Sequence, residues 1–190
     1  MHKLALAAMV ALIAGPTLAH TGHGDVSGFW HGLTHPILGP DHLLAMLAVG
    51  LWSGFVLQSR FWAGAVAFIA AMVLGAGLSW AGVGFAMVET VIVASVVVFG
   101  LLTVVSRRGQ GGWLTGLSLM AIAGFASAHG HAHATEAAGN VFGYLAGFVI
   151  STAALHLVGI GIARSVAARP LVQQAMGAGV ALSGLLMMAG

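Results

Sequence analysis

Six long apolar segments dominate this chain, and they restrict it to a membrane-embedded fold. Each is near or above the ~20 residues that an α-helix needs to cross ~30 Å of hydrocarbon. Only 5% of the 190 residues are charged, whereas soluble domains carry about 25%. The mean hydropathy is +1.03. We therefore predict an all-α, polytopic bundle of six transmembrane helices. The six predicted spans are 28–57, 61–82, 86–106, 112–131, 138–163 and 171–189.

The rest of the composition excludes several classes of function. There is no cysteine, so disulfides and thiolate metal sites are ruled out. Six basic residues are too few for a nucleic-acid surface. No Walker-type Gly-Lys-Ser/Thr loop occurs, which argues against an ATP-driven pump built from this chain alone. No prosthetic group is expected, and the lipid bilayer is an expected partner.

Residues 1–19 have the pattern of a cleaved signal peptide, which leaves 20–190 as one six-helix transmembrane domain. Lys3 precedes an apolar core at 4–14, Gly15-Pro16 breaks it, and small residues at 17 and 19 fit a cleavage site. The alternative is an uncleaved helix, although about 11 apolar residues are short for a span.

The basic residues predict the orientation of the bundle. If the mature N-terminus is exported, the loops after spans one, three and five face the cytoplasm. These loops hold all five arginines of the mature chain, which follows the positive-inside rule. They are Arg60, Arg107, Arg108, Arg164 and Arg169. We therefore expect a bacterial inner-membrane protein with both mature termini external, and all five tryptophans lie near predicted span ends.

The stretch from His31 to His42 carries the strongest chemical signal. Ionisable groups inside a bilayer mark a site or a pathway by default, and imidazole with carboxylate suits divalent transition metals. His31 and His35 share a helical face. Pro36 and Pro40 bracket Gly39, so we predict that the first span is broken there. Asp41 could be a direct ligand or could orient an imidazole, and the face of His42 cannot be deduced.

A second group of donors follows the fourth span. If this segment is helical, His129 and His133 share a face and His131 points away; if it is extended, all three share one side. A solvated loop that only scavenges metal is the alternative. Glu136 could add an oxygen ligand. Glu89, at the start of span three, could equally be a ligand, a proton carrier or an interfacial residue.

The sequence gives weaker support for a metal-binding role of three further histidines. Cleavage after Ala19 would give His20 an α-amine beside its imidazole, with His23 nearby, as a chelating terminus. His156 lies deep in span five, where a hydrogen-bonded bundle histidine and an exit-path residue are equally supported.

Small residues also recur at helical spacing in span five. Gly139, Gly143 and Gly147 would form one flat face, which allows close helix packing. Packing within the monomer is favoured, and an oligomer contact is the alternative.

The segment His35-Pro-Ile-Leu-Gly-Pro-Asp41-His42, followed by Leu-Leu-Ala-Met-Leu-Ala-Val-Gly-Leu-Trp, closely resembles the signature of the HupE/UreJ family. The resemblance covers essentially the whole chain. It implies a nickel permease, in some members a cobalt permease, associated with hydrogenase or urease maturation. A separate nickel/cobalt transporter family has four residues between its His and Asp-His; this chain has five, so that family's site geometry is not transferred.

The sequence thus predicts a permease, not an enzyme, that imports Ni²⁺ or Co²⁺. His35, Asp41 and His42 would form the central site with His129, His133 and Glu89. An intramembrane metalloenzyme and a metal-storing or metal-sensing partner of another transporter are the rival readings. No His-Glu-x-x-His sequence supports hydrolysis. Ligand chemistry does not choose between nickel and cobalt.

Overall fold

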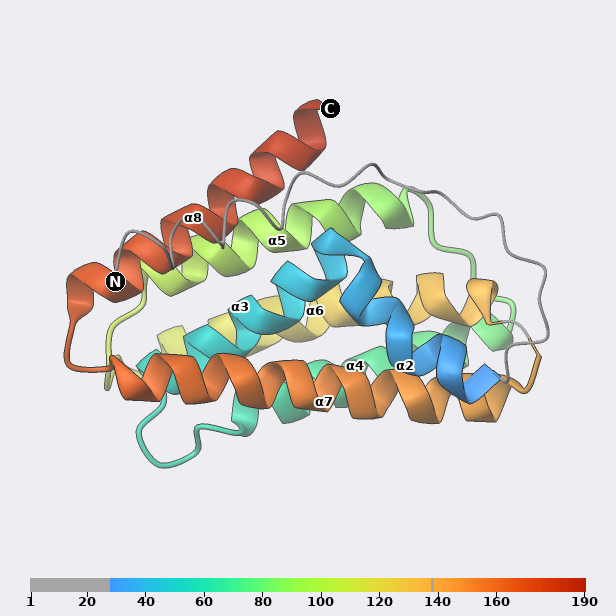
Figure 1. The fold of residues 1–190 in the computed structure, drawn as a ribbon, viewed down its shortest axis with the longest axis horizontal. Coiled ribbons are helices and arrows are strands. Elements are labelled where there is room, and N and C mark those ends of the chain that lie inside the picture. Colours follow the sequence, from blue (N-terminus) through green and yellow to red (C-terminus); the bar gives the residue numbers. More distant parts are fainter. Residues whose placement is uncertain (1–27, 138) are drawn as a thin grey trace.

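The computed structural model describes residues 28–137 and 139–190, and this part of the chain is all-helical. The predicted signal peptide, His20 and His23 lie outside the described residues. Seven helices follow one another in the described part (Figure 1). They are α2 (Gly28–Leu38), α3 (Pro40–Val56), α4 (Ala63–Trp80), α5 (Val88–Val105), α6 (Gly112–Glu136), α7 (Val141–Ser165) and α8 (Pro170–Ala189).

The break predicted between Pro36 and Pro40 is present as a sharp bend. α2 and α3 meet at Gly39 and are bent by 77° relative to each other. Pro40 occupies the first turn of α3, where a missing N–H costs nothing. The helix continues through Pro36, so the chain changes direction only at Gly39.

Four helices are long and apolar enough to cross a membrane, and the bent pair counts as a fifth span if α2 and α3 are taken together. The four are α4, α5, α7 and α8. α6 is longer, but its last turns are rich in histidine. A multi-pass membrane bundle follows from these helices, while the number six stays a prediction.

The centre of the bundle is α3, which is buried almost all round from Ala45 to Val56. It packs against α7, α5 and α4. The approach to α7 is close, since a Cβ at Gly50 would lie 2.4 Å from the His156 carbonyl oxygen. The outer helices instead expose large apolar side chains, such as Leu74, Leu157 and Leu186, as helices facing lipid do.

The two ends of the bundle differ in charge. The three loops that carry arginine lie together at the left end in Figure 1, and the α4–α5 and α6–α7 loops lie at the right. Two contacts confirm that the arginine loops are neighbours. Arg164 lies 4.6 Å over the Phe61 ring, and the Gly109 N–H donates to the Val56 carbonyl at 3.3 Å.

Two expectations about individual residues need correction. Trp52 is 1% exposed and donates its indole N–H to Ser106 at 3.0 Å, so it belongs to the core and not to an interfacial belt. Gly139 precedes α7 with a φ of +72°, so it lies in a turn and not on the helix face. Gly147 does pack within the chain, because its Cβ would lie 2.1 Å from the Phe29 carbonyl oxygen of α2.

Candidate metal centre

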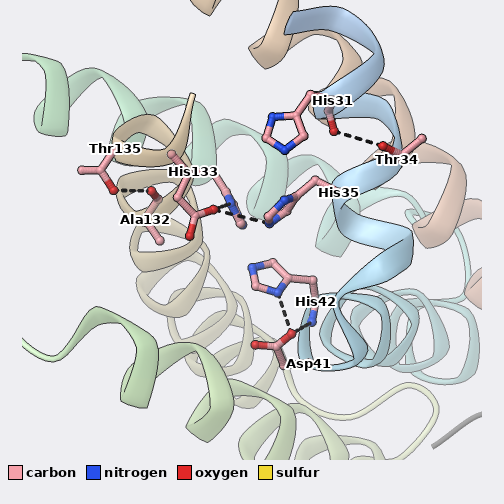
Figure 2. A network of polar contacts seen from close by, with 9 residues as sticks. His31, Thr34, His35, Asp41, His42, Ala132, His133 and Thr135 are labelled. Carbon is pink, nitrogen blue, oxygen red and sulfur yellow. Dashed lines mark hydrogen bonds and ion pairs between the residues drawn. The ribbon is translucent and has the colours of Figure 1, made fainter. Parts of the chain in front are cut away.

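Three histidines from three helices converge inside the bundle. His35 of α2, His42 of α3 and His133 of α6 each offer one ring nitrogen, and these nitrogens all lie within 4.8 Å of one another. The ring centroids are 5.5 Å apart for His35 and His42, 4.7 Å for His35 and His133, and 4.4 Å for His42 and His133. We call these three residues the histidine cluster (Figure 2).

The bend at Gly39 makes this convergence possible. In a straight helix, residues 35 and 42 would be separated by about 10 Å along the axis. Gly39 takes an extended conformation, with φ −86° and ψ 114°, and the 77° bend turns His35 back toward His42. His133 then approaches from α6, and the ring of Phe148 covers it at 4.2 Å.

Two carboxylates fix the orientation of the cluster. Asp41 Oδ1 lies 2.7 Å from His42 Nδ1 and accepts the His42 backbone N–H at 2.9 Å. Glu136 Oε2 lies 3.2 Å from His133 Nδ1 and 3.4 Å from His35 Nε2. A carboxylate held against one ring nitrogen places the proton there and leaves the other nitrogen as a lone pair. Asp41 also sits in the first turn of α3, where the helix dipole stabilises its negative charge.

The opposite ring nitrogens are the ones that a cation could use. Within the described part of the chain, His42 Nε2 and His133 Nε2 are buried and have no hydrogen-bond partner. Buried polar atoms normally have one. Bare imidazole nitrogens facing one another, with carboxylates behind them, form a set that suits a divalent transition metal. Of the two roles open to Asp41, the geometry supports the orienting one.

His129 and His31 flank the cluster on either side. His129 is fully buried one turn before His133, with its ring 5.2 Å from that of His42. Its Nε2 lies 3.0 Å from Ser95 Oγ, whose own proton goes to the Ile92 carbonyl at 2.6 Å. The His129 Nε2 therefore donates, and its Nδ1 carries the lone pair. His31 lies at the rim, 5.7 Å from the His35 ring.

The chain is similar to known proteins over almost its whole length. The family described as HupE / UreJ protein matches residues 7–187. The chain is also 36% identical over 186 residues to Protein HupE from Rhizobium leguminosarum bv. viciae, which covers 95% of both chains. The chain belongs to the HupE/UreJ family. The resemblance seen in residues 35–52 is thereby confirmed, and no solved structure matches.

His131 and Glu89 are also predicted metal ligands of this HupE/UreJ chain. The segment 129–133 is helical, so His131 points away from its neighbours; its Nε2 lies 2.7 Å from the Val83 carbonyl oxygen, to which it donates. Glu89 is exposed in the first turn of α5. Among the described residues, neither belongs to the three-histidine group.

Sequence reasoning missed two aromatic residues of α7 in this HupE/UreJ site. Tyr144 is 2% exposed, and its ring lies 5.3 Å from His31 and 6.4 Å from His35. Phe148, one turn later, contacts His133 with its ring tilted by 40°. The signal was weak but present, since Tyr144 is the single tyrosine of the chain and lies in an apolar span one turn from Phe148.

Proposed function

We propose that this HupE/UreJ chain is a secondary permease that imports Ni²⁺, or Co²⁺, across the bacterial inner membrane for hydrogenase or urease maturation. One observation carries the proposal. Three histidines converge inside a bundle of apolar helices, and the inward nitrogens of His42 and His133 have no hydrogen-bond partner among the described residues. The family to which the chain belongs supports transport over catalysis.

The charges around the cluster fit a passing divalent cation. The three imidazoles supply the ligand nitrogens, while Asp41 and Glu136 stand behind them and offset the double charge. Under a potential of ~100 mV, negative inside, entry of a divalent ion is favoured by roughly 4.6 kcal/mol, so no ATP is needed.

The test is uptake of radioactive Ni²⁺ by liposomes that contain only this purified protein, with protein-free liposomes as the control. We expect saturable uptake that Co²⁺ inhibits and Mg²⁺ does not, because imidazole ligands favour the transition metals. Stoichiometric binding without uptake would contradict the permease and support a storage or sensing role instead.

A further inference from the structure

A fourth buried histidine lies deeper in the bundle and is also prepared to bind a cation. His156 of α7 is fully buried, and its Nδ1 lies 2.6 Å from the Thr152 carbonyl oxygen. A carbonyl only accepts, so Nδ1 carries the proton and Nε2 is a lone pair. Within the described residues, His156 Nε2 and the Thr152 hydroxyl are buried without a hydrogen-bond partner.

The position of His156 is inward of the histidine cluster. Phe148, on the same helix, contacts His133 at 4.2 Å between ring centroids. His156 comes eight residues later, which corresponds to about 12 Å along the helix axis toward the arginine-bearing end. One ion could not contact both the cluster and His156, so His156 would belong to a separate site.

An apolar ring stands on the route between these two places. Phe68 of α4 is 0% exposed. Its ring lies 5.4 Å from that of His129 and 5.0 Å from that of His156. His129 in turn lies 5.2 Å from His42 of the cluster. A chain of ring contacts therefore runs from the histidine cluster through His129 and Phe68 to His156.

We propose that His156, with the Thr152 hydroxyl, forms a second binding site for a divalent cation, which we call the inner station. We further propose that Phe68 is the barrier between the inner station and the histidine cluster. This inference rests on the proposed function for its direction of travel. A phenyl ring offers no ligand to a partly dehydrated ion, so passage requires the ring to move aside. With one ion site on each side of the Phe68 ring, the bundle would pass one ion at a time and would not form an open pore.

A purely structural role for His156 explains only half of the arrangement. The bond from Nδ1 to the Thr152 carbonyl would anchor the ring to its own helix. It leaves Nε2 and a neighbouring hydroxyl buried without partners, which is unfavourable in any protein interior. A cation bound at Nε2 would give that nitrogen the partner it lacks.

The inner station is tested by counting bound ions. The purified full chain in detergent is dialysed against Ni²⁺ alone, and the ions bound per chain are counted for wild type, His156→Ala and His131→Ala. We expect His156→Ala to lose the ion bound at the inner station, whereas His131→Ala keeps the wild-type number. Histidines of the N-terminal segment are the same in all three proteins and cancel in the comparison. An unchanged count in His156→Ala overturns the station.

The barrier is tested by flux in liposomes. Phe68→Ala and the milder Phe68→Val should raise the initial Ni²⁺ flux by about tenfold, the effect of a modest reduction of the barrier. Phe68→Leu, which keeps an apolar plug of similar reach, should stay close to wild type. If Phe68→Ala and Phe68→Val fold and still show wild-type flux, Phe68 is not the barrier. Wild-type protein that binds Ni²⁺ at His156 but takes none up contradicts the permease and leaves the station standing.

Discussion

At the scale of single residues, Asp41 determines which nitrogen of His42 faces the histidine cluster. Its Oδ1 holds Nδ1 at 2.7 Å and the backbone N–H at 2.9 Å. The nitrogen left available to a cation is therefore Nε2, on the far side of the ring. The Asp41 carboxylate would act on a cation in two ways, by orienting the His42 ring and by its negative charge. A variant of Asp41 therefore differs from a variant of His42, which removes the ligand itself.

Replacing Asp41 with Asn should weaken Ni²⁺ binding by about 10–100-fold, the usual effect of removing a carboxylate behind a metal-binding histidine. Asparagine keeps the size and one acceptor oxygen but removes the charge. His42→Ala removes a ligand outright and should weaken binding more. Equilibrium dialysis of the purified proteins measures both dissociation constants.

His131→Ala is the matched control, because His131 bonds to the Val83 carbonyl and faces away from the cluster. Its Ni²⁺ affinity should equal that of wild type. If Asp41→Asn and His42→Ala also bind Ni²⁺ normally, the cluster is not the site. If His131→Ala loses as much affinity for Ni²⁺ as His42→Ala, the ions bind near His131 and not only at the histidine cluster.

The residue types of the site could be predicted from the sequence, but their pairing could not. Spacing left two arrangements open for His129, His131 and His133, and the structure shows the helical one, with His129 and His133 on one face. The face of His42 and the role of Asp41 depend on the angle at Gly39. That angle is set by the packing of α2 against α7 and α3, which no local pattern encodes.

At the scale of helices, α4 and α6 approach so closely that glycine is required. A Cβ at Gly130 would lie 1.8 Å from the Met72 carbonyl oxygen, and a Cβ at Gly75 would lie 2.0 Å from that of Ser127. Gly130 immediately follows His129, so this contact also determines where the histidines of α6 stand relative to α3.

Gly130→Ala should therefore destabilise the protein by about 1–3 kcal/mol, the usual effect of overpacking, and should weaken Ni²⁺ binding by moving α6. Gly124 of the same helix is the control, because nothing lies within 4 Å of its Cβ position. Gly124→Ala should be neutral or stabilise by about 0.5–1 kcal/mol. Thermal unfolding in detergent measures both. Equal melting temperatures for the two variants would show that α4 and α6 are further apart.

Hydropathy and proline positions were sufficient to predict the helices themselves. Each predicted span overlaps a helix or, for 28–57, the bent pair. The sequence did not predict which helices pack together. Glycines at the same spacing occur both where two helices are in close contact and where nothing lies nearby. Gly112 and Gly116, for example, have nothing within 4 Å, although their spacing matches that of Gly143 and Gly147.

At the scale of the whole molecule, one end of the bundle carries the arginines and the other lies nearer the histidines. The positive-inside rule predicts that the arginine end lies in the cytoplasm. The chain has no cysteine, so single cysteines can be introduced without background. Gly84→Cys in the α4–α5 loop and Gly111→Cys before α6 are both at exposed positions.

In intact cells, an impermeant thiol reagent should label Gly84→Cys and leave Gly111→Cys unlabelled until the membrane is opened. The reason is the one-sided distribution of arginine. Normal Ni²⁺ uptake by both variants is the control for folding. The reverse labelling pattern would show that the bundle has the opposite orientation in the membrane.

The membrane potential should set the direction and extent of transport if the chain is a simple facilitator. At ~100 mV, negative inside, a divalent ion accumulates more than about a thousandfold at equilibrium, since ~4.6 kcal/mol acts on it. Liposomes loaded with K⁺ and treated with valinomycin provide this potential, and liposomes with equal K⁺ on both sides provide none. We expect strong accumulation in the first case and only equilibration in the second. Accumulation that ignores the potential and follows an imposed pH gradient would show instead that Ni²⁺ moves in exchange for protons, with Glu136 or Asp41 as the nearest carboxylates to the cluster.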